Sequence, residues 1–171
     1  MTWNDFYQRQ HAIRAVLDHA REHPAVPLDL DLVPAAAAVF TDRGQLLRAL
    51  QHKWSSSLTG RIDIGIEDAD ADPRGDRVEA VSAAWRRTTA DHPVLRRVLD
   101  SHADDPAITG LLSRERRMLA VSAGLAEQHE PAAELDRVGA AFLGLLRAAA
   151  PSARTRRRGP LSQLRKVIPS R

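Results

Sequence analysis

Hydrophobic residues recur at helical spacing along most of the chain. In residues 5–22 they fall three, four and seven positions apart, which marks one face of an amphipathic helix. The same spacing returns in stretches that begin near residues 42, 76, 93, 106 and 131. A residue suited to the start of a helix opens each stretch, namely Thr41 or Asp42, Asp76, Pro93, Asp105 with Pro106, and Pro131. The pattern predicts an all-α fold, a bundle of six or seven helices with little or no sheet.

Two stretches have a different pattern. Leucines alternate with aspartates over residues 28–32, as in a short strand, and Pro34 then opens an Ala-rich stretch with room for one short helix. Isoleucines alternate over residues 62–66, where we expect the preceding helix to continue to about residue 64; a short strand is the alternative. Residues 67–76 are acidic and are predicted to be a solvated linker. Together with Glu79 they approach the spacing of a calcium-binding loop, but Pro73 stands where that loop needs glycine.

The positive charge of the chain is concentrated at its C-terminal end. Residues 151–171 contain seven Lys or Arg and no Asp or Glu, whereas residues 1–150 contain 18 cations and 22 acids. Such a segment buries too little apolar surface to fold alone, so we expect a flexible, disordered basic tail. Attraction to phosphate is then expected from this tail or from a local patch on the body.

Composition removes several classes of chemistry. The chain has no cysteine, which excludes disulfides and thiolate sites and agrees with a cytoplasmic protein. No apolar run approaches the ~20 residues of a membrane span, so we expect no stable membrane insertion. No glycine-rich phosphate loop, nucleophile motif or metal-ligand motif occurs, and we expect no enzyme activity, no cofactor and no metal. An enzyme would need a buried charged cluster that the sequence does not display.

One short motif resembles a known family. TetR-family regulators end their DNA-binding domain with an aromatic pair, two small polar residues, a cation and a Leu-Leu-x-Ala-Leu run. Residues 39–50 are similar to this junction and read VFTDRGQLLRAL. The resemblance implies a TetR-like helical layout, with Arg43 at the position of the family's phosphate-contacting cation. It also implies that the last two helices pair in a homodimer.

The chain departs from that family where the reading head belongs. Only residues 25–38 lie between the first helix and the motif, which leaves space for one short helix and not for a helix-turn-helix. Residues 34–40 carry no polar side chain that could contact base edges. Residues 1–60 contain six cations and six acids, and this balance predicts a neutral face.

These observations predict three regions: a reduced N-terminal helical region over 1–60, a helical regulatory and dimerisation region over 61–150, and the tail over 151–171. Small residues near Gly139 and Gly144 favour a homodimer through helices at about 106–128 and 131–149. A pocket for a small apolar effector is predicted near Trp85, Met118 and Phe142. The candidate nucleic-acid contacts are Arg43, Arg154, Arg156, Arg157, Arg158, Arg165 and Lys166.

The sequence therefore favours a TetR-like regulatory protein that binds nucleic acid and acts in transcription regulation. The alternative is a helical adaptor that does not bind DNA and uses the scaffold for contacts with other proteins.

Overall fold

The computed structural model describes residues 3–149, and every regular element in that range is an α-helix. The prediction of an all-α fold is confirmed. The described residues form seven helices: α1 (Trp3–Glu22), α2 (Pro34–Ala37), α3 (Arg43–Ala71), α4 (Arg77–Asp91), α5 (Pro93–Ser101), α6 (Pro106–Ser122) and α7 (Ala132–Ala149).

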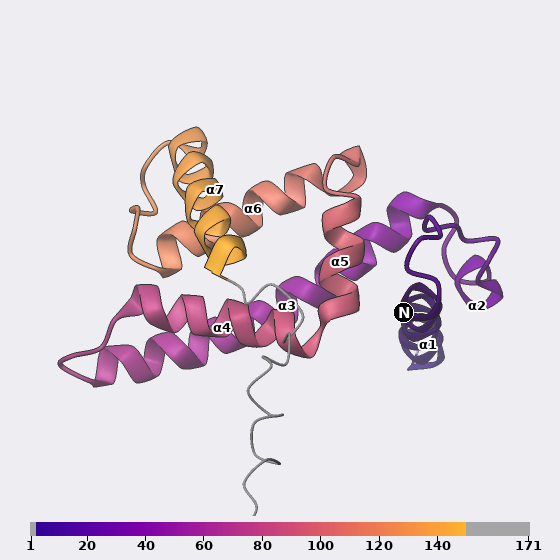
Figure 1. Ribbon diagram of the computed structural model, residues 1–171, viewed down its shortest axis with the longest axis horizontal. Helices are drawn as coiled ribbons and strands as arrows, with labels where there is room; N and C mark the ends of the chain where they lie inside the picture. Colours follow the sequence, from indigo (N-terminus) through magenta and orange to yellow (C-terminus); the bar gives the residue numbers. More distant parts are fainter. Residues whose placement is uncertain (1–2, 150–171) are drawn as a thin grey trace, which may run out of the picture.

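The longest helix, α3, is the axis around which the others are arranged (Figure 1). α4 returns along its C-terminal half, α6 packs against α3, and α7 packs along α6. α5 links α4 to α6. α1 and α2 lie together at one end of the molecule, beside α5 and the N-terminal part of α3.

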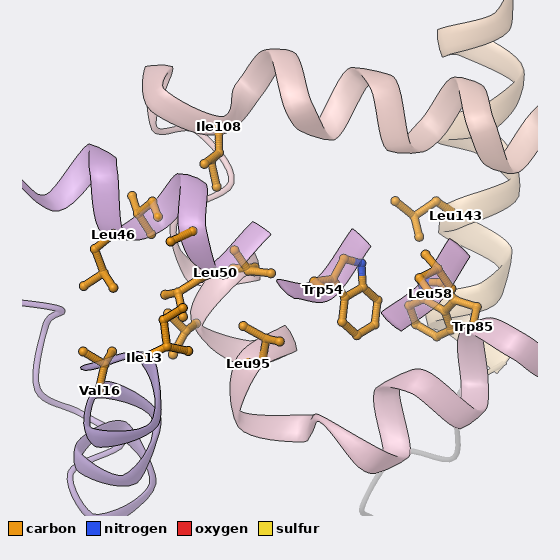
Figure 2. Packing of buried hydrophobic residues seen from close by; sticks show 14 of the residues in the cluster. Ile13, Val16, Leu46, Leu50, Trp54, Leu58, Trp85, Leu95, Ile108 and Leu143 are labelled. Atoms are coloured by element: carbon orange, nitrogen blue, oxygen red, sulfur yellow. The ribbon is translucent and has the colours of Figure 1, made fainter. Parts of the chain in front are cut away.

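One continuous hydrophobic cluster joins all seven of these described helices. Figure 2 shows it running from Ile13 of α1 along α3 to Trp54, and on to Trp85 of α4 and Leu143 of α7. Both tryptophans are buried. α3 passes without interruption through residue 60, where the sequence suggested a change of region, and the cluster continues past that point.

The helix starts follow the predicted caps. The Asp42 carboxylate accepts a hydrogen bond from the backbone N–H of Gln45, and Asp76 accepts from the backbone N–H groups of Val78 and Glu79. Asp105 accepts from the backbone N–H of Ala107, with Pro106 as the first residue of α6. Each cap satisfies N–H groups that a helix leaves without partners, so these three starts are fixed locally.

The segment between the first helix and residue 43 holds one short helix, as predicted. Between Glu22 and Arg43 the only helix is α2, with four residues. The leucine-rich stretch 28–32 is irregular and ends in a turn, so it is not a strand. These residues contain no helix-turn-helix, because a second helix and its turn are missing.

The predicted acidic linker over residues 67–76 is wrong in its first half. α3 continues to Ala71, so Asp68 and Asp70 are helical and only residues 72–76 connect α3 to α4. The Asp70 carboxylate accepts two hydrogen bonds from the Arg77 guanidinium, which closes the hairpin between the two helices. A helical segment does not form a calcium-binding loop.

α6 ends at Ser122, earlier than the predicted limit of about residue 128. Gly124 has a φ of +68°, and the N–H of Leu125 donates to the carbonyl of Ala120. The N–H of Gly124 donates to the carbonyl of Val121, which completes a glycine-terminated helix end. Gly124 was the sequence signal for this stop.

Candidate nucleic-acid interface

A surface cleft of about 680 Å³ between α1 and α3 is lined by cations and by no Asp or Glu. Arg9 of α1 lines it together with Arg48 and Lys53 of α3, and Phe6 contributes an aromatic ring. The Arg9 guanidinium also lies 4.9 Å from the centre of the buried Phe40 ring, which holds its stem against the body.

A second cleft, of about 570 Å³, adjoins the first along α1 and shares Lys53 with it. It adds Arg14 and Arg21, and its single acid, Asp18, lies 2.6 Å from the Arg21 guanidinium. We name Arg9, Arg14, Arg48 and Lys53 the basic face. Within residues 3–149 none of these four cations forms an ion pair.

The positive charge of Lys53 also acts on His92, which lies outside both clefts. The pKa of His92, at the junction of α4 and α5, lies below its usual value, first because the ring is partly buried. The charges of Lys53 and Arg61 lower this pKa further, because they oppose protonation of the imidazole.

Balanced charge in the first 60 residues therefore does not mean a neutral face. Asp42 caps α3 and Asp29 accepts a hydrogen bond from the backbone N–H of Asp31, while Asp18, which lines the second cleft, pairs with Arg21. A balanced count of cations and acids therefore does not show how these charges are distributed on the folded surface. The basic face could not be predicted from the sequence because its members come from two helices.

Arg43, predicted to contact phosphate, lies at the start of α3 with its side chain about half exposed. Its guanidinium donates to the Asp105 carboxylate at 3.0 Å and so ties α3 to the start of α6. The pKa of Asp105 lies below its usual range, first through the N–H of Ala107 and then through the charge of Arg43. The other predicted contacts, Arg154, Arg156, Arg157, Arg158, Arg165 and Lys166, lie outside the described residues.

The residues predicted to line an effector pocket have different surroundings. Trp85 and Phe142 are buried in the hydrophobic cluster, whereas Met118 is half-buried and lines a cleft of about 260 Å³ between α3 and α6. Gln51 and Glu115 line the same cleft.

A buried polar cluster adjoins this cleft and was not predicted. The Glu115 carboxylate accepts hydrogen bonds from the Gln51 amide at 2.6 Å and from the Trp54 indole N–H at 3.0 Å. Figure 2 shows the Trp54 nitrogen turned toward α6, the helix that carries Glu115. Arg96 of α5 is also buried; its guanidinium lies 3.5 Å from Glu115 and 4.8 Å from the centre of the Trp54 ring.

The cluster continues to the surface through carboxylate–arginine pairs. Arg96 lies 3.0 Å from Asp100, which also accepts from Arg147 of α7 at 2.6 Å. Acids and arginines alternate along this chain of contacts, so the buried charges compensate one another. The arrangement joins α3, α5, α6 and α7 at the centre of the bundle.

Comparison with protein families, with curated proteins and with solved structures finds no match for this chain. The resemblance of residues 39–50 to TetR-family regulators therefore stays a prediction from sequence. Among the described residues no helix has the length and apolarity needed to cross a membrane.

Proposed function

We propose that this chain is a regulatory protein with a TetR-like helical layout that binds nucleic acid mainly through phosphate contacts. One observation carries the proposal: the basic face gathers four cations that form no ion pair within residues 3–149, while the sequence adds seven more after residue 150. Clustered Lys and Arg attract the phosphate backbone and release its counterions.

The reduced head supports a weak preference for base sequence. α2 has four residues, all proline or alanine, so it offers no side chain that could donate to or accept from a base edge. Phosphate contacts position a protein on nucleic acid without reading sequence. A role in transcription regulation would then depend on partners or on local concentration, and not on an operator read by this chain.

The salt dependence of binding tests the proposal. We expect the full chain to bind a fluorescent duplex with an affinity that falls steeply with salt, by roughly 0.9 log units per tenfold salt for each phosphate neutralised. Replacing Arg48 and Lys53 by Gln is expected to weaken binding and to reduce the slope by up to about 1.8. Replacing Arg154, Arg156, Arg157 and Arg158 by Gln is expected to reduce it further.

A matched control removes a cation elsewhere. Arg74→Gln lowers the charge of the exposed loop between α3 and α4, at the end of α3 opposite α1 (Figure 1), and is expected to leave the slope nearly unchanged. If the full chain shows no salt-dependent binding to duplex or single-stranded DNA, the proposal is wrong. Tight binding of one duplex sequence by a chain lacking residues 151–171 would instead mean that residues 25–43 read bases.

The predicted homodimer and small effector belong to the same proposal. The outward face of α7 exposes Ala140, Ala141, Gly144 and Leu145, which could pair with a second copy. Of the three residues predicted to line an effector pocket, Met118 lines the cleft between α3 and α6, and we propose this cleft as the effector site.

The second candidate function is the helical adaptor. It is favoured by the same α7 face, because an exposed apolar helix surface suits a partner protein as well as a second copy. An adaptor would keep its protein partner when the basic face and the tail arginines are replaced, and it would not bind nucleic acid.

A further inference from the structure

Three aromatic side chains at the N-terminal end of α1 are exposed. Trp3 is 79% exposed, Tyr7 64% and Phe6 45%. The Trp3 and Tyr7 ring centres lie 6.3 Å apart with their planes inclined by 29°, and Phe6 meets Tyr7 edge to face at 5.8 Å. The chain has three Trp, one Tyr and three Phe, so nearly half of its aromatic residues lie in this group and not in the core. Such a cluster points to a surface function.

The rings lead directly into the basic face. With about 3.6 residues per turn, Trp3, Tyr7, Gln10 and Arg14 lie on one outward face of α1. Tyr7 lines the same cleft as Arg14 and Lys53, and Phe6 lines the cleft that contains Arg48. Flat apolar surfaces therefore adjoin unpaired cations over about three turns of one helix.

We infer that this face binds single-stranded nucleic acid, with unpaired bases stacked on Trp3 and Tyr7 and the phosphates of the same strand along Arg14, Lys53 and Arg48. The inference rests on the proposed function, since it names the form of nucleic acid that the basic face takes. It does not require sequence reading, because every base has a flat face on which an aromatic ring can stack.

The combination of groups selects this partner over others. A duplex keeps its bases stacked inside. Its phosphates would contact the cations, but it has no unpaired base that could stack on the exposed rings. An acidic peptide would pair with the cations but brings no row of flat groups. A single strand presents both unpaired bases and phosphates, and this face offers rings on α1 beside cations on α1 and α3.

The test compares the full chain with variants of the exposed rings. Labelled oligothymidylate of about 15 nucleotides and a labelled duplex of the same length are titrated in parallel, with binding followed by anisotropy. Replacing Trp3 and Tyr7 by Ala is expected to weaken single-strand binding about tenfold or more and to change duplex binding less than twofold. Replacing both by Phe keeps a ring at each position and is expected to restore most of the affinity.

The matched control is Ile64→Ala, which removes an equally exposed apolar side chain from the C-terminal half of α3 and is expected to change neither affinity. Intrinsic fluorescence gives an independent readout. Trp54 and Trp85 are buried, so quenching of tryptophan emission by unlabelled oligothymidylate would come from Trp3 and is expected to vanish in Trp3→Phe.

The outcomes separate this inference from the proposed function. If the Ala variant binds the single strand as well as the natural chain, the stacking inference is wrong while phosphate binding by the basic face and tail stands. If the natural chain binds neither oligonucleotide, the proposed function itself fails. An emission change on vesicles of phosphatidylserine and phosphatidylcholine, with none on oligothymidylate, would overturn the inference in favour of a membrane surface.

Discussion

At the scale of single residues, Gly139 sets how closely α7 approaches α6. A Cβ atom at this position would lie 1.9 Å from the backbone carbonyl oxygen of Arg116, far inside a non-bonded contact. Gly144, further along the same helix, has open space where its Cβ would be. The sequence grouped these two glycines as one face for a partner subunit, but Gly139 is occupied by packing within the chain.

We expect opposite effects from the same substitution at these two glycines. Gly139→Ala is predicted to lower the free energy of unfolding by about 1–3 kcal/mol, because backbone must move to admit the methyl group. Gly144→Ala is predicted to raise it by about 0.5–1 kcal/mol, since alanine has the higher helix propensity. Urea unfolding measures both. Equal changes would mean that α6 and α7 do not cross at residue 139.

The buried Glu115 is the second position where one residue decides the packing. Glu115→Leu removes an anion from beside the buried Arg96 and leaves the Trp54 indole N–H without its acceptor. Breaking a buried pair in this way is predicted to cost about 3–5 kcal/mol of unfolding free energy. The double variant Glu115→Leu/Arg96→Met is expected to lose less than the sum of the two single variants, because no unpaired charge is left behind.

At the scale of elements, a partly buried histidine, His92, lies at the junction of α4 and α5 and is influenced by the charges of Lys53 and Arg61. His92 ends α4, precedes Pro93 at the start of α5, and lies with its Nε2 3.2 Å from the Ser57 hydroxyl of α3. Burial and the charges of Lys53 and Arg61 lower its pKa. The folded state therefore binds a proton at this position less readily than the unfolded chain does.

This shift predicts a loss of stability as the pH falls. Because the folded pKa of His92 lies below the unfolded value of about 6.5, the unfolded state takes up more protons below that pH. Unfolding free energy should be constant above pH 7 and should decrease from about pH 6.5 downward through the folded pKa. His92→Gln is expected to flatten this part of the profile, whereas the control His129→Gln, in the exposed α6–α7 loop, should leave it unchanged.

Carboxylates act in a separate, more acidic window. The pKa of Asp91 is lowered by its hydrogen bond to Arg61, and that of Asp136 by its hydrogen bond to Arg116. Their stabilisation is present above the ordinary carboxylate range and is lost as the pH falls through their lowered folded values. A profile whose only slope lies below pH 4 would contradict the role given to His92.

Helix positions were predictable because their signals are local. Each of Asp42, Asp76 and Asp105 caps a helix through backbone N–H groups two or three residues away, so the sequence carries the whole interaction. The length of α3 was underestimated because the hydrogen bonds from Arg77 to Asp70 that support its last turns join two helices. The Glu115 cluster could not be predicted from the sequence either, because it joins residues that are far apart along the chain: Gln51 and Glu115 are 64 positions apart.

At the scale of the whole molecule, α7 leaves one apolar face outward. Leu145 is 69% exposed there, next to Gly144 and the alanines at 140 and 141. The proposed homodimer would cover this face, and an obligate interface needs upwards of about 2,000 Å² in total.

Light scattering tests that assembly with a matched pair of variants. The natural chain is expected to have the mass of a dimer, and Leu145→Glu that of a monomer, because a charge would be buried at the centre of the interface. Ile64→Glu places the same charge at a residue of α3 that is 64% exposed and is expected to remain dimeric. A monomer mass for the natural chain at high micromolar concentration would count decisively against the dimer.

The position of α1 at the edge of the bundle has a consequence for local opening. α1 packs mainly against α2, α3 and α5, and no partner covers its outward side within the described residues, whereas α3 is enclosed by several helices (Figure 1). Backbone amides of α1 should therefore exchange with solvent deuterium through an opening that leaves the rest of the bundle folded, while those of α3 should need global unfolding. A nucleic-acid strand bound along the outward face of α1 should slow that exchange, because the open state no longer presents the surface to which the nucleic acid binds.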